Sequence, residues 1–476
     1  MKFVSTRGGM APANFMDILL DGLAPDGGLV VPETTPRLNT DELAALRDLS
    51  YAELAARIIG LFATDIPRED LERITETAYG TDRFPENTVP VTYLHDEFFL
   101  VGLSAGPTMA FKDLAMQFLG QAIPYVLEKT GRTLNIVGAT SGDTGSSAEH
   151  AFKGAPGVSV YMLSPKGRMS AVQRAQMYSI TDSNIHNLVV DGVFDDCQDI
   201  VKAVNNDADF KRTHHIGAVN SINFGRIAAQ VVYYFWAWLR YTDIVDEDYT
   251  TENAGQREIA VCVPSGNFGN IYAGHLARRM GVPIARLMLA TNENNVLDEF
   301  FTTGHYTPRS RENTYATSSP SMDISKASNL ERFVYDLVGA KEFPEAWAQL
   351  DAQGTVDLES YVARLGAEFG FASAKSVHQD RLDSIRATFE ETGVVIDPHT
   401  ADGVTVAKRL SDGTLPVLIM ETAKPDKFRE TVVEALGQDA PDASDVVKDM
   451  LKREQFTVDM PNSADAIKAY IEEEDR

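Results

Sequence analysis

The sequence Val261-Cys-Val-Pro-Ser-Gly-Asn-Phe-Gly-Asn-Ile271 predicts a buried strand that ends in a tight loop and opens a helix. Backbone amides at such a helix start have no partner within the helix, so they can converge on a phosphate group. The amides concerned are those of Gly266, Asn267, Phe268, Gly269 and Asn270. This is not a Walker loop, because no Gly-Lys-Ser/Thr follows, and its glycine spacing does not match a dinucleotide fingerprint. A ligand with a mononucleotide-like phosphate is therefore expected.

The surrounding chain alternates short apolar strands with amphipathic helices from about residue 96 onward. The predicted strands are Leu134–Thr140, Val158–Leu163, Leu188–Asp191, Ile259–Pro264, Arg286–Ala290 and Pro416–Glu421. This alternation is typical of an α/β fold with mostly parallel sheets, and we expect two of them.

The pattern also predicts three regions. Residues 1–95 have apolar positions at helical spacing and are expected to form a helical N-terminal domain. Residues 96–437 should form the core, with a small α/β domain at about 130–225 and a large one from the remainder. Residues 438–476 are charged and helix-prone, so we expect a C-terminal helical extension. Within the core, residues 305–330 are rich in Ser and Thr, and a loop of that length favours an active-site role over a linker role.

Composition excludes several classes of partner. The chain has 476 residues, 44% of them hydrophobic, and its 69 acidic against 43 basic residues give a formal net charge of −26. Such a charge opposes binding to nucleic acid or to an anionic membrane. No apolar run reaches the roughly 18 to 20 residues of a membrane span, and the first ten residues do not resemble a signal peptide. A cytoplasmic globular enzyme is expected.

Cysteines and histidines give no sign of a metal site. Cys197 and Cys262 lie far apart in apolar surroundings, as reduced core thiols do. None of the nine histidines shows a helical pairing that would gather a metal, and the adjacent His214 and His215 cannot easily face one ion. No metal is predicted.

A second motif, Gly106-Pro-Thr-Met-Ala-Phe-Lys-Asp113, is a turn that leads into a long helix. Lys112 would lie in the first turn, where the helix dipole disfavours a positive charge. Its apolar neighbours Phe111 and Leu114 would further lower its pKa and favour the free amine that forms imines. Taken alone, this motif fits an ordinary surface lysine better.

A third loop, Ala139-Thr-Ser-Gly-Asp-Thr-Gly-Ser146, also joins a strand to a helix. It offers the hydroxyls and amides that suit a carboxylate or a second phosphate. The alternative is a plain turn with a good helix cap.

These motifs, in this order, resemble those of threonine synthases of the bacterial and fungal type. The resemblance extends to Ser5-Thr-Arg-Gly8, Asn220-Ser-Ile-Asn223, Arg226-Ile-Ala-Ala-Gln230, Ser321-Met-Asp323 and Glu421-Thr-Ala-Lys-Pro-x-Lys-Phe428, and it covers nearly the whole chain. It implies a fold similar to that of tryptophan synthase β and a pyridoxal 5′-phosphate cofactor. The implied activity converts O-phospho-L-homoserine and water to L-threonine and phosphate by γ-elimination and β-addition of water, the last step of threonine biosynthesis.

The resemblance also implies roles for individual residues. Lys112 would bind the cofactor as a Schiff base and move protons during turnover, while the glycine loop at residues 266–270 would hold the cofactor phosphate. Thr422 would meet the pyridine nitrogen; alternatively, it ends a strand and caps a helix that begins near Pro425. Asn270 and Asp143 stand where related chains often have Asp and Asn respectively, which leaves the partner of the cofactor's 3′ oxygen open.

Substrate binding would fall to residues that supply cations, hydroxyls or amides. The candidates are Thr140, Ser141, Asp143, Thr144, Ser221, Asn223, Arg226 and Lys326, with Lys424 as a further cation. A threonine or serine dehydratase remains the alternative within this chemistry, and a non-catalytic nucleotide-binding protein is the alternative outside it. We expect a small-molecule substrate and a monomer or homodimer.

Overall fold

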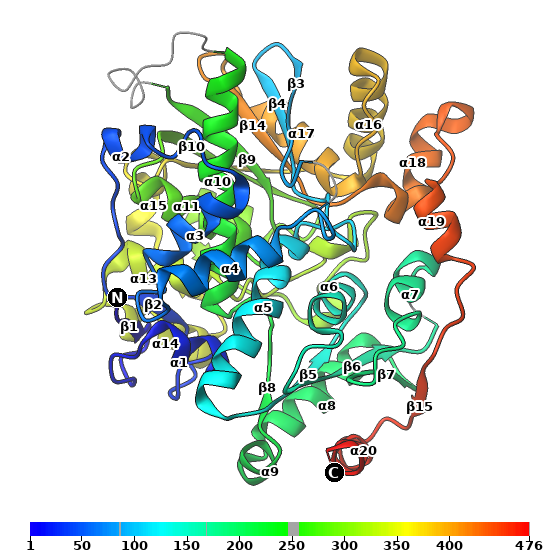
Figure 1. Cartoon of the computed structure of the whole chain (residues 1–476). Helices are drawn as coiled ribbons and strands as arrows, with labels where there is room; N and C mark the ends of the chain where they lie inside the picture. The colour runs from blue at the N-terminus through cyan, green and yellow to red at the C-terminus, as the bar shows by residue number, and fades with distance from the viewer. Residues whose placement is uncertain (85–86, 168, 246–256, 476) are drawn as a thin grey trace.

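A computed structural model of the chain describes residues 1–84, 87–167, 169–245 and 257–475 (Figure 1). Two large sheets dominate it, with strand orders β13-β10-β9-β14-β4-β3 and β15-β7-β6-β5-β8. The first contains β3 (Val91–His95), β4 (Phe98–Gly102), β9 (Ile259–Pro264), β10 (Ile284–Thr291), β13 (Phe371–Lys375) and β14 (Val417–Glu421). The second contains β5 (Leu134–Ala139), β6 (Val158–Pro165), β7 (Ile185–Val190), β8 (Ile216–Gly217) and β15 (Val458–Met460). The expected α/β class is confirmed.

Neighbouring strands are parallel in both sheets except at one edge, where β3 and β4 form an antiparallel hairpin across Asp96 and Glu97. Each of the six strands predicted from the sequence is present, with ends displaced by up to three residues. Of the strands in these two sheets, the pattern did not predict β3, β4, β8, β13 or β15. Of these, β13 reads Phe-Ala-Ser-Ala-Lys, and its small residues give no β-branched signal.

Helices cover both faces of the six-stranded sheet. On one face lie α10 (Phe224–Val245) and α11 (Gly269–Arg279), and on the other lie α16 (His378–Thr392), α17 (Pro398–Leu410) and α18 (Arg429–Leu436). Most of α10 is buried, which explains why its sequence is apolar on nearly every side. No helix among the described residues is both long and apolar enough to cross a membrane.

The five-stranded sheet is covered in the same way. Helices α5 (Lys112–Thr130), α6 (Asp143–Phe152) and α7 (Ala171–Tyr178) pack on one face, and α8 (Phe194–Asn206) and α20 (Ala464–Glu474) pack on the other. One apolar core continues from this sheet through α5 to α10 and the large sheet. Cys197 and Cys262 are buried free thiols, as expected.

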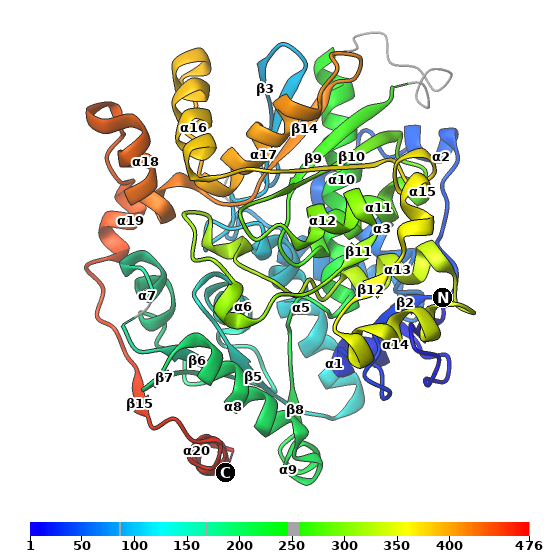
Figure 2. The ribbon, with the colours of Figure 1, turned by 180° about the vertical axis from the view of Figure 1, so that it is seen from behind.

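The two ends of the chain wrap the outside. The N-terminal part, with β1 (Phe3–Ser5), β2 (Val30–Pro32), α1 (Phe15–Asp21), α2 (Thr40–Ala44), α3 (Tyr51–Gly60) and α4 (Arg68–Ala78), packs around α10 and α5. The C-terminal segment runs from α18 past α19 (Asp445–Met450) down one side of the molecule to α20 (Figures 1 and 2). It is not wholly helical, because β15 pairs with the edge strand β7 through its backbone.

The remaining elements are short. They are α9 (Ala208–Thr213), α12 (Val296–Thr303), β11 (His305–Tyr306), α13 (Leu330–Val338), α14 (Phe343–Gln353), β12 (Val356–Asp357) and α15 (Val362–Ala367). Between β11 and α13 the chain contains only two single-turn 3₁₀ helices, so residues 307–329 form the long loop that the composition predicted.

Parallel strands point their carboxyl ends to one edge of a sheet, and that edge is where α/β proteins place ligands. Strand β5 leads to Thr140, β9 to the glycine loop and β14 to Thr422. Two backbone hydrogen bonds then tie the start of α5 to this edge: Phe111 N donates to Thr422 O at 2.9 Å, and Lys424 N donates to Met109 O at 3.1 Å. The lysine motif and Thr422 are therefore neighbours.

Candidate active site

Lys112 is the first residue of α5 and is largely buried, with 14% of its side chain exposed. Its Nζ lies 5.6 Å from the centre of the Phe111 ring, and Leu114 is fully buried nearby in the chain. An apolar surface therefore flanks the amine. Gly106 is required at the start of this motif, because a Cβ there would lie 2.5 Å from the Cβ of Asp113.

One carboxylate lies between two buried lysines. Asp143 Oδ2 is 3.4 Å from Lys112 Nζ, and Asp143 Oδ1 is 2.6 Å from Lys427 Nζ. Ser321 Oγ donates to Oδ2 at 2.8 Å, and Gln173 Nε2 donates to Oδ1 at 3.3 Å. Asp143 thus links the small sheet, through α6, to the loop at residues 307–329 and to the segment after β14.

This arrangement divides the charge unequally. Burial lowers the pKa of Lys112; Asp143 opposes this effect, while Lys427 and Arg226 add to it. Burial would raise the pKa of Asp143, but Lys427 and Lys112 together hold it well below its usual value. The result is an amine that loses its proton more readily than an exposed lysine does, next to a carboxylate that stays ionised.

The glycine loop forms an anion cradle in its backbone. No described residue accepts a hydrogen bond from the amides of residues 266–270. Phe268, at φ 64°, caps α11 without a side-chain hydrogen bond, so the amides at the start of the helix stay free. A Cβ on Gly266 would lie 3.0 Å from Met322 Cα, so any other residue here would press on the backbone of the 307–329 loop.

Asn270 is held in the core by its side-chain oxygen, while its side-chain nitrogen has no partner in the described part of the chain. Its Oδ1 accepts hydrogen bonds from Tyr233 at 2.7 Å and from Tyr234 at 2.8 Å, within the core behind the helix. The backbone amide of Asn270 and its buried Nδ2 both remain without an acceptor among the described residues. The side chain of Asn267 donates to Ser221 Oγ, and its Oδ1 accepts from Ser328 N at 2.9 Å.

Thr422 follows the last residue of β14 and is 6% exposed. The 3₁₀ helix after it begins at Pro425 with Lys424 at the cap position, so Thr422 does not cap that helix. Its backbone amide faces Thr400 Oγ1 at 3.4 Å, and no described residue bonds its hydroxyl. That hydroxyl remains available to a ligand.

In the third loop, Thr140 stabilises the turn at residues 140–145 through its own hydroxyl. Its hydroxyl accepts hydrogen bonds from Gly142 N and Gly145 N, both at 2.9 Å, and the residue is buried. Ser141 is exposed and Thr144 is half-buried in the first turn of α6. Ser141 and Thr144 therefore offer hydroxyls to a ligand more freely than Thr140 does.

The first turn of α10 contains an unusual cation. Arg226 is 2% exposed, forms no ion pair with a described carboxylate, and donates from Nη1 to Val219 O at 3.3 Å. Its Nε is buried without a partner, and burial lowers its pKa to about 10, against the opposing influence of Tyr233. The side chain of Asn223, by contrast, is bonded at both polar atoms: its Nδ2 donates to Leu19 O, and its Oδ1 accepts from Gly225 N, both at 2.9 Å.

The two other candidate cations are less enclosed. Lys326 is exposed in the long loop, and Lys424 is 39% exposed and paired with Glu421 at 2.9 Å. Sequence reasoning missed three residues of the site, namely the buried Lys427 and His399 and the half-buried Ser321. Lys427 and Ser321 lie in motifs that were recognised, but nothing in their spacing indicated a contact with Asp143.

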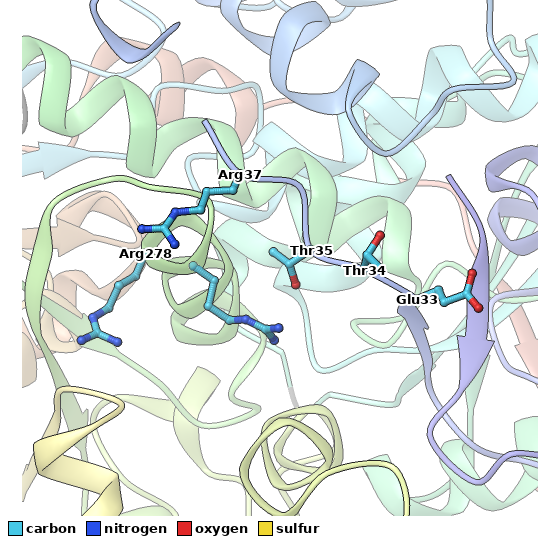
Figure 3. A pocket seen from close by; sticks show the side chains of 6 residues that line it. Glu33, Thr34, Thr35, Arg37 and Arg278 are labelled. Carbon is cyan, nitrogen blue, oxygen red and sulfur yellow. The ribbon is translucent and has the colours of Figure 1, made fainter. Parts of the chain in front are cut away.

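Two other features lie apart from this set. A hollow of about 610 Å³ is lined by Glu33, Thr34, Thr35, Arg37, Arg278 and Arg279 (Figure 3). Arg278 and Arg279 are held by Ile284 O at 2.8 Å and by Asp336 at 2.6 Å, so they complete the end of α11. His305, Asp357 and Glu359 form an exposed group elsewhere, with their polar atoms within 4.8 Å of one another.

The residues present suit a phosphorylated carbonyl cofactor. The glycine loop supplies a row of free amides, Lys112 supplies a buried amine of lowered pKa, and the Thr422 hydroxyl is free. The buried and unpaired Nε of Arg226 points to a second anion nearby. Buried polar groups are ordinarily hydrogen-bonded within the protein. Donors that are left without a partner here therefore indicate a bound ligand.

The family models that match this chain, and two of its relatives, belong to threonine synthases or to pyridoxal-phosphate-dependent enzymes. Residues 2–79 match the family "Threonine synthase N terminus", residues 91–349 match "Pyridoxal-phosphate dependent enzyme", and residues 400–471 match "Threonine synthase, C-terminal". The chain is 53% identical to a threonine synthase of Methylobacillus glycogenes, covering 92% of each chain. It is 49% identical to that of Corynebacterium glutamicum, covering 99% of this chain and 98% of the relative.

Solved structures give the same picture. A threonine synthase from Brucella melitensis with bound pyridoxal phosphate superposes with a TM-score of 0.92 at 38% identity, covering 100% of each chain. The yeast threonine synthase superposes with a TM-score of 0.91 at 33% identity, covering 99% of this chain and 98% of the other.

Proposed function

Because the chain belongs to the threonine synthase family of pyridoxal-phosphate-dependent enzymes, we propose that it converts O-phospho-L-homoserine and water to L-threonine and phosphate around Lys112. Family membership confirms the enzyme class and the cofactor that the sequence indicated. The single observation that carries the substrate assignment is the buried guanidinium of Arg226, which pairs with no described carboxylate and whose Nε has no described partner; its charge also lowers the pKa of Lys112.

Three groups would hold the cofactor. Lys112 would bind its carbonyl carbon, the amides of residues 266–270 its phosphate, and the Thr422 hydroxyl its ring nitrogen. When bound, pyridoxal phosphate supplies an electron sink for bonds at the substrate's Cα, whereas the protein supplies position and charge. A neutral hydroxyl at the ring nitrogen does not force that nitrogen to stay protonated.

Lys112 would act as the base and proton carrier of the reaction. A lysine must be neutral to take a proton from Cα, and its pKa is lowered by burial and by the two nearby cations. Lys427 forms the closer ion pair with Asp143, at 2.6 Å. Asp143 therefore stabilises the protonated form of Lys112, at 3.4 Å, less than it would in the absence of Lys427. The Lys112 amine would take a proton from Cβ as phosphate leaves, give one to Cγ, and return one to Cα after water adds at Cβ.

The substrate phosphate needs local cations, because the chain has a net charge of −26. Repulsion from distant acidic groups fades over a Debye length of about 8 Å at physiological salt, so nearby groups decide binding. We assign the phosphate to Arg226, with Lys326 and Lys424 as outer cations and the Ser221 hydroxyl beside them; the side chain of Asn223 is bonded to Leu19 O and Gly225 N and would act by holding the turn before Arg226. The amino-acid carboxylate would lie on the loop of residues 140–144, at the hydroxyls of Ser141 and Thr144, because Thr140 bonds the loop itself and Asp143 faces the two lysines.

The test is stoichiometry with the purified protein. Given O-phospho-L-homoserine, we expect threonine and phosphate in equal amounts, and no ammonia from threonine or serine without a phosphate group. Arg226→Gln should raise KM for the ester at least about tenfold, because a charge-assisted bond is lost, while Arg226→Lys recovers part of it. Deamination of serine or threonine at rates equal to ester turnover would indicate a dehydratase instead.

Small-molecule turnover is what family membership supports most directly. The monomer or homodimer, the cytoplasmic location and the boundaries of the N-terminal, core and C-terminal domains remain predictions from the sequence.

A further inference from the structure

A buried carboxylate at the start of α17 receives four hydrogen bonds. Asp397 accepts from His399 N and Thr400 N, each at 3.0 Å, from Thr400 Oγ1 at 2.5 Å, and it faces His399 Nδ1 at 2.6 Å. The two amide bonds are those of an ordinary helix cap. The bond to the imidazole is additional, and it fixes the direction in which the ring points.

The far side of that ring holds the long loop. His399 Nε2 lies 3.0 Å from Ser321 N, which belongs to a segment 78 residues earlier. A backbone amide can only donate, so Nε2 accepts, and in the neutral ring Nδ1 therefore carries the proton that it donates to Asp397. His399 is 2% exposed, so water does not substitute for either contact.

Ser321 in turn contacts the reacting end of the site. Its hydroxyl donates to Asp143 Oδ2 at 2.8 Å, the oxygen that faces Lys112 Nζ. The next residue, Met322, packs over Gly266 in the anion cradle. The position of residues 321–322 therefore affects both the partner of Lys112 and the roof of the glycine loop.

Asp397 also reaches the opposite end of the site. The Thr400 hydroxyl that it binds lies 3.4 Å from Thr422 N, and Thr422 O accepts the hydrogen bond of Phe111 N at 2.9 Å. A single carboxylate thus lies behind both the Ser321–Asp143 contact and the backbone of the residue assigned to the ring nitrogen.

We propose that His399, oriented by Asp397, is a positioning residue that holds Ser321 on Asp143 and thereby sets the charge around Lys112. This inference rests on the proposed function at one point, the assignment of Lys112 as the catalytic lysine. An N-terminal cap for α17 explains the amide bonds of Asp397. It does not explain why a buried imidazole spans from that cap to a loop on another part of the chain.

Two substitutions distinguish the hydrogen bond at Nε2 of His399 from the one at Nδ1. His399→Gln can place an amide oxygen near the position of Nε2, and so keeps an acceptor for Ser321 N. His399→Asn can donate to Asp397 in place of Nδ1, but it is too short to reach Ser321. Both remove the imidazole, so a loss of packing alone would affect them equally.

The readout is amide hydrogen exchange of peptides spanning residues 317–324 in the full-length, cofactor-loaded protein. His399→Asn should raise their exchange rate about tenfold, the effect of one lost hydrogen bond, and His399→Gln should stay within about threefold of the unsubstituted protein. His399→Asn should also shift the pH midpoint of the cofactor's absorbance upward, because Asp143 would lose a donor and act more strongly on Lys112.

His275→Asn is the matched control, since His275 is also buried and also pairs with a carboxylate, Asp336, at 3.2 Å. It should leave residues 317–324 unchanged. Equal exchange in His399→Asn and His399→Gln, or a rise spread evenly over α5 and α10, would overturn the proposal. Threonine formation is assayed separately, so failure of the substrate assignment would not alter the exchange result.

Discussion

Lys427 Nζ lies 2.6 Å from Asp143 Oδ1, closer than the catalytic candidate Lys112, whose Nζ lies 3.4 Å from the other oxygen of the same carboxylate. Lys427 is fully buried and also donates to Thr108 O at 2.9 Å. It therefore takes the larger share of the negative charge of Asp143. The pKa of Lys112 falls through burial, an effect that Asp143 opposes only in part.

Lys427→Gln should raise the pKa of Lys112, because a nearby positive charge disappears and Asp143 then interacts with Lys112 alone. A shift of about 1 unit is expected for a neighbouring charge, which lowers activity at a fixed pH below the midpoint by up to about tenfold. The pH dependence of kcat/KM should move upward accordingly. Lys452→Gln is the control, because the side chain of Lys452 is exposed. If the pH profile of kcat/KM in Lys427→Gln does not move, Lys427 and Lys112 do not share the charge of Asp143.

Asp143→Asn tests the same group through stability. The folded-state pKa of Asp143 is held well below its ordinary value of 3.8, so its contribution is present above about pH 4 and is lost as pH falls through the folded value. At pH 7 the variant leaves the buried ammonium group of Lys427 without its counter-charge and should lose about 3 kcal/mol of unfolding free energy. Urea denaturation should then show a smaller decline between pH 5 and pH 3 than in the unsubstituted protein, and equal declines would exclude a depressed pKa.

Gly266→Ala should empty the cofactor site. The added Cβ would lie 3.0 Å from Met322 Cα and 3.3 Å from Met322 O, and backbone atoms cannot move aside cheaply. We expect at least about a tenfold loss of cofactor affinity, in line with the cost of overpacking. Gly366→Ala is the matched control, because its nearest neighbour would be Phe371 O at 3.7 Å. Equal cofactor affinity in the two variants would count against a tight roof over the cradle.

Thr422→Asp should change the chemistry and leave the fold intact. A carboxylate at this place would favour a protonated ring nitrogen, which retains electrons and slows the later steps at Cβ and Cγ. We expect altered cofactor absorbance with substrate and a lower ratio of threonine to side products, whereas Thr422→Ser should be tolerated. A folded Thr422→Asp protein with unchanged spectra and products would remove Thr422 from the cofactor site.

The glycine loop and the lysine motif could be predicted because each is written in one continuous stretch. A strand, a glycine-bearing turn and a helix start follow one another within residues 261–271, and local geometry then dictates free amides. The strand ends were less predictable, since backbone pairing extends β10 to both sides of its apolar centre.

The charge network could not be predicted in the same way. Lys427 contacts Thr108 across 319 residues of sequence, and His399 meets Ser321 only because α17 and the long loop approach each other in space. Strand β15 was missed for a related reason: its three residues are mostly exposed and join the sheet through backbone pairing with β7. Such contacts depend on the tertiary arrangement and leave no local pattern.

The central claim is that Lys112 is the lysine that binds the cofactor. Reduction of the loaded protein with borohydride, followed by peptide mapping, tests it most directly, because reduction makes the bond between the cofactor and its lysine permanent. The account predicts that the label is found on Lys112, and that Lys112→Ala retains no label and no turnover. A label on Lys427, the other buried lysine beside Asp143, would contradict it.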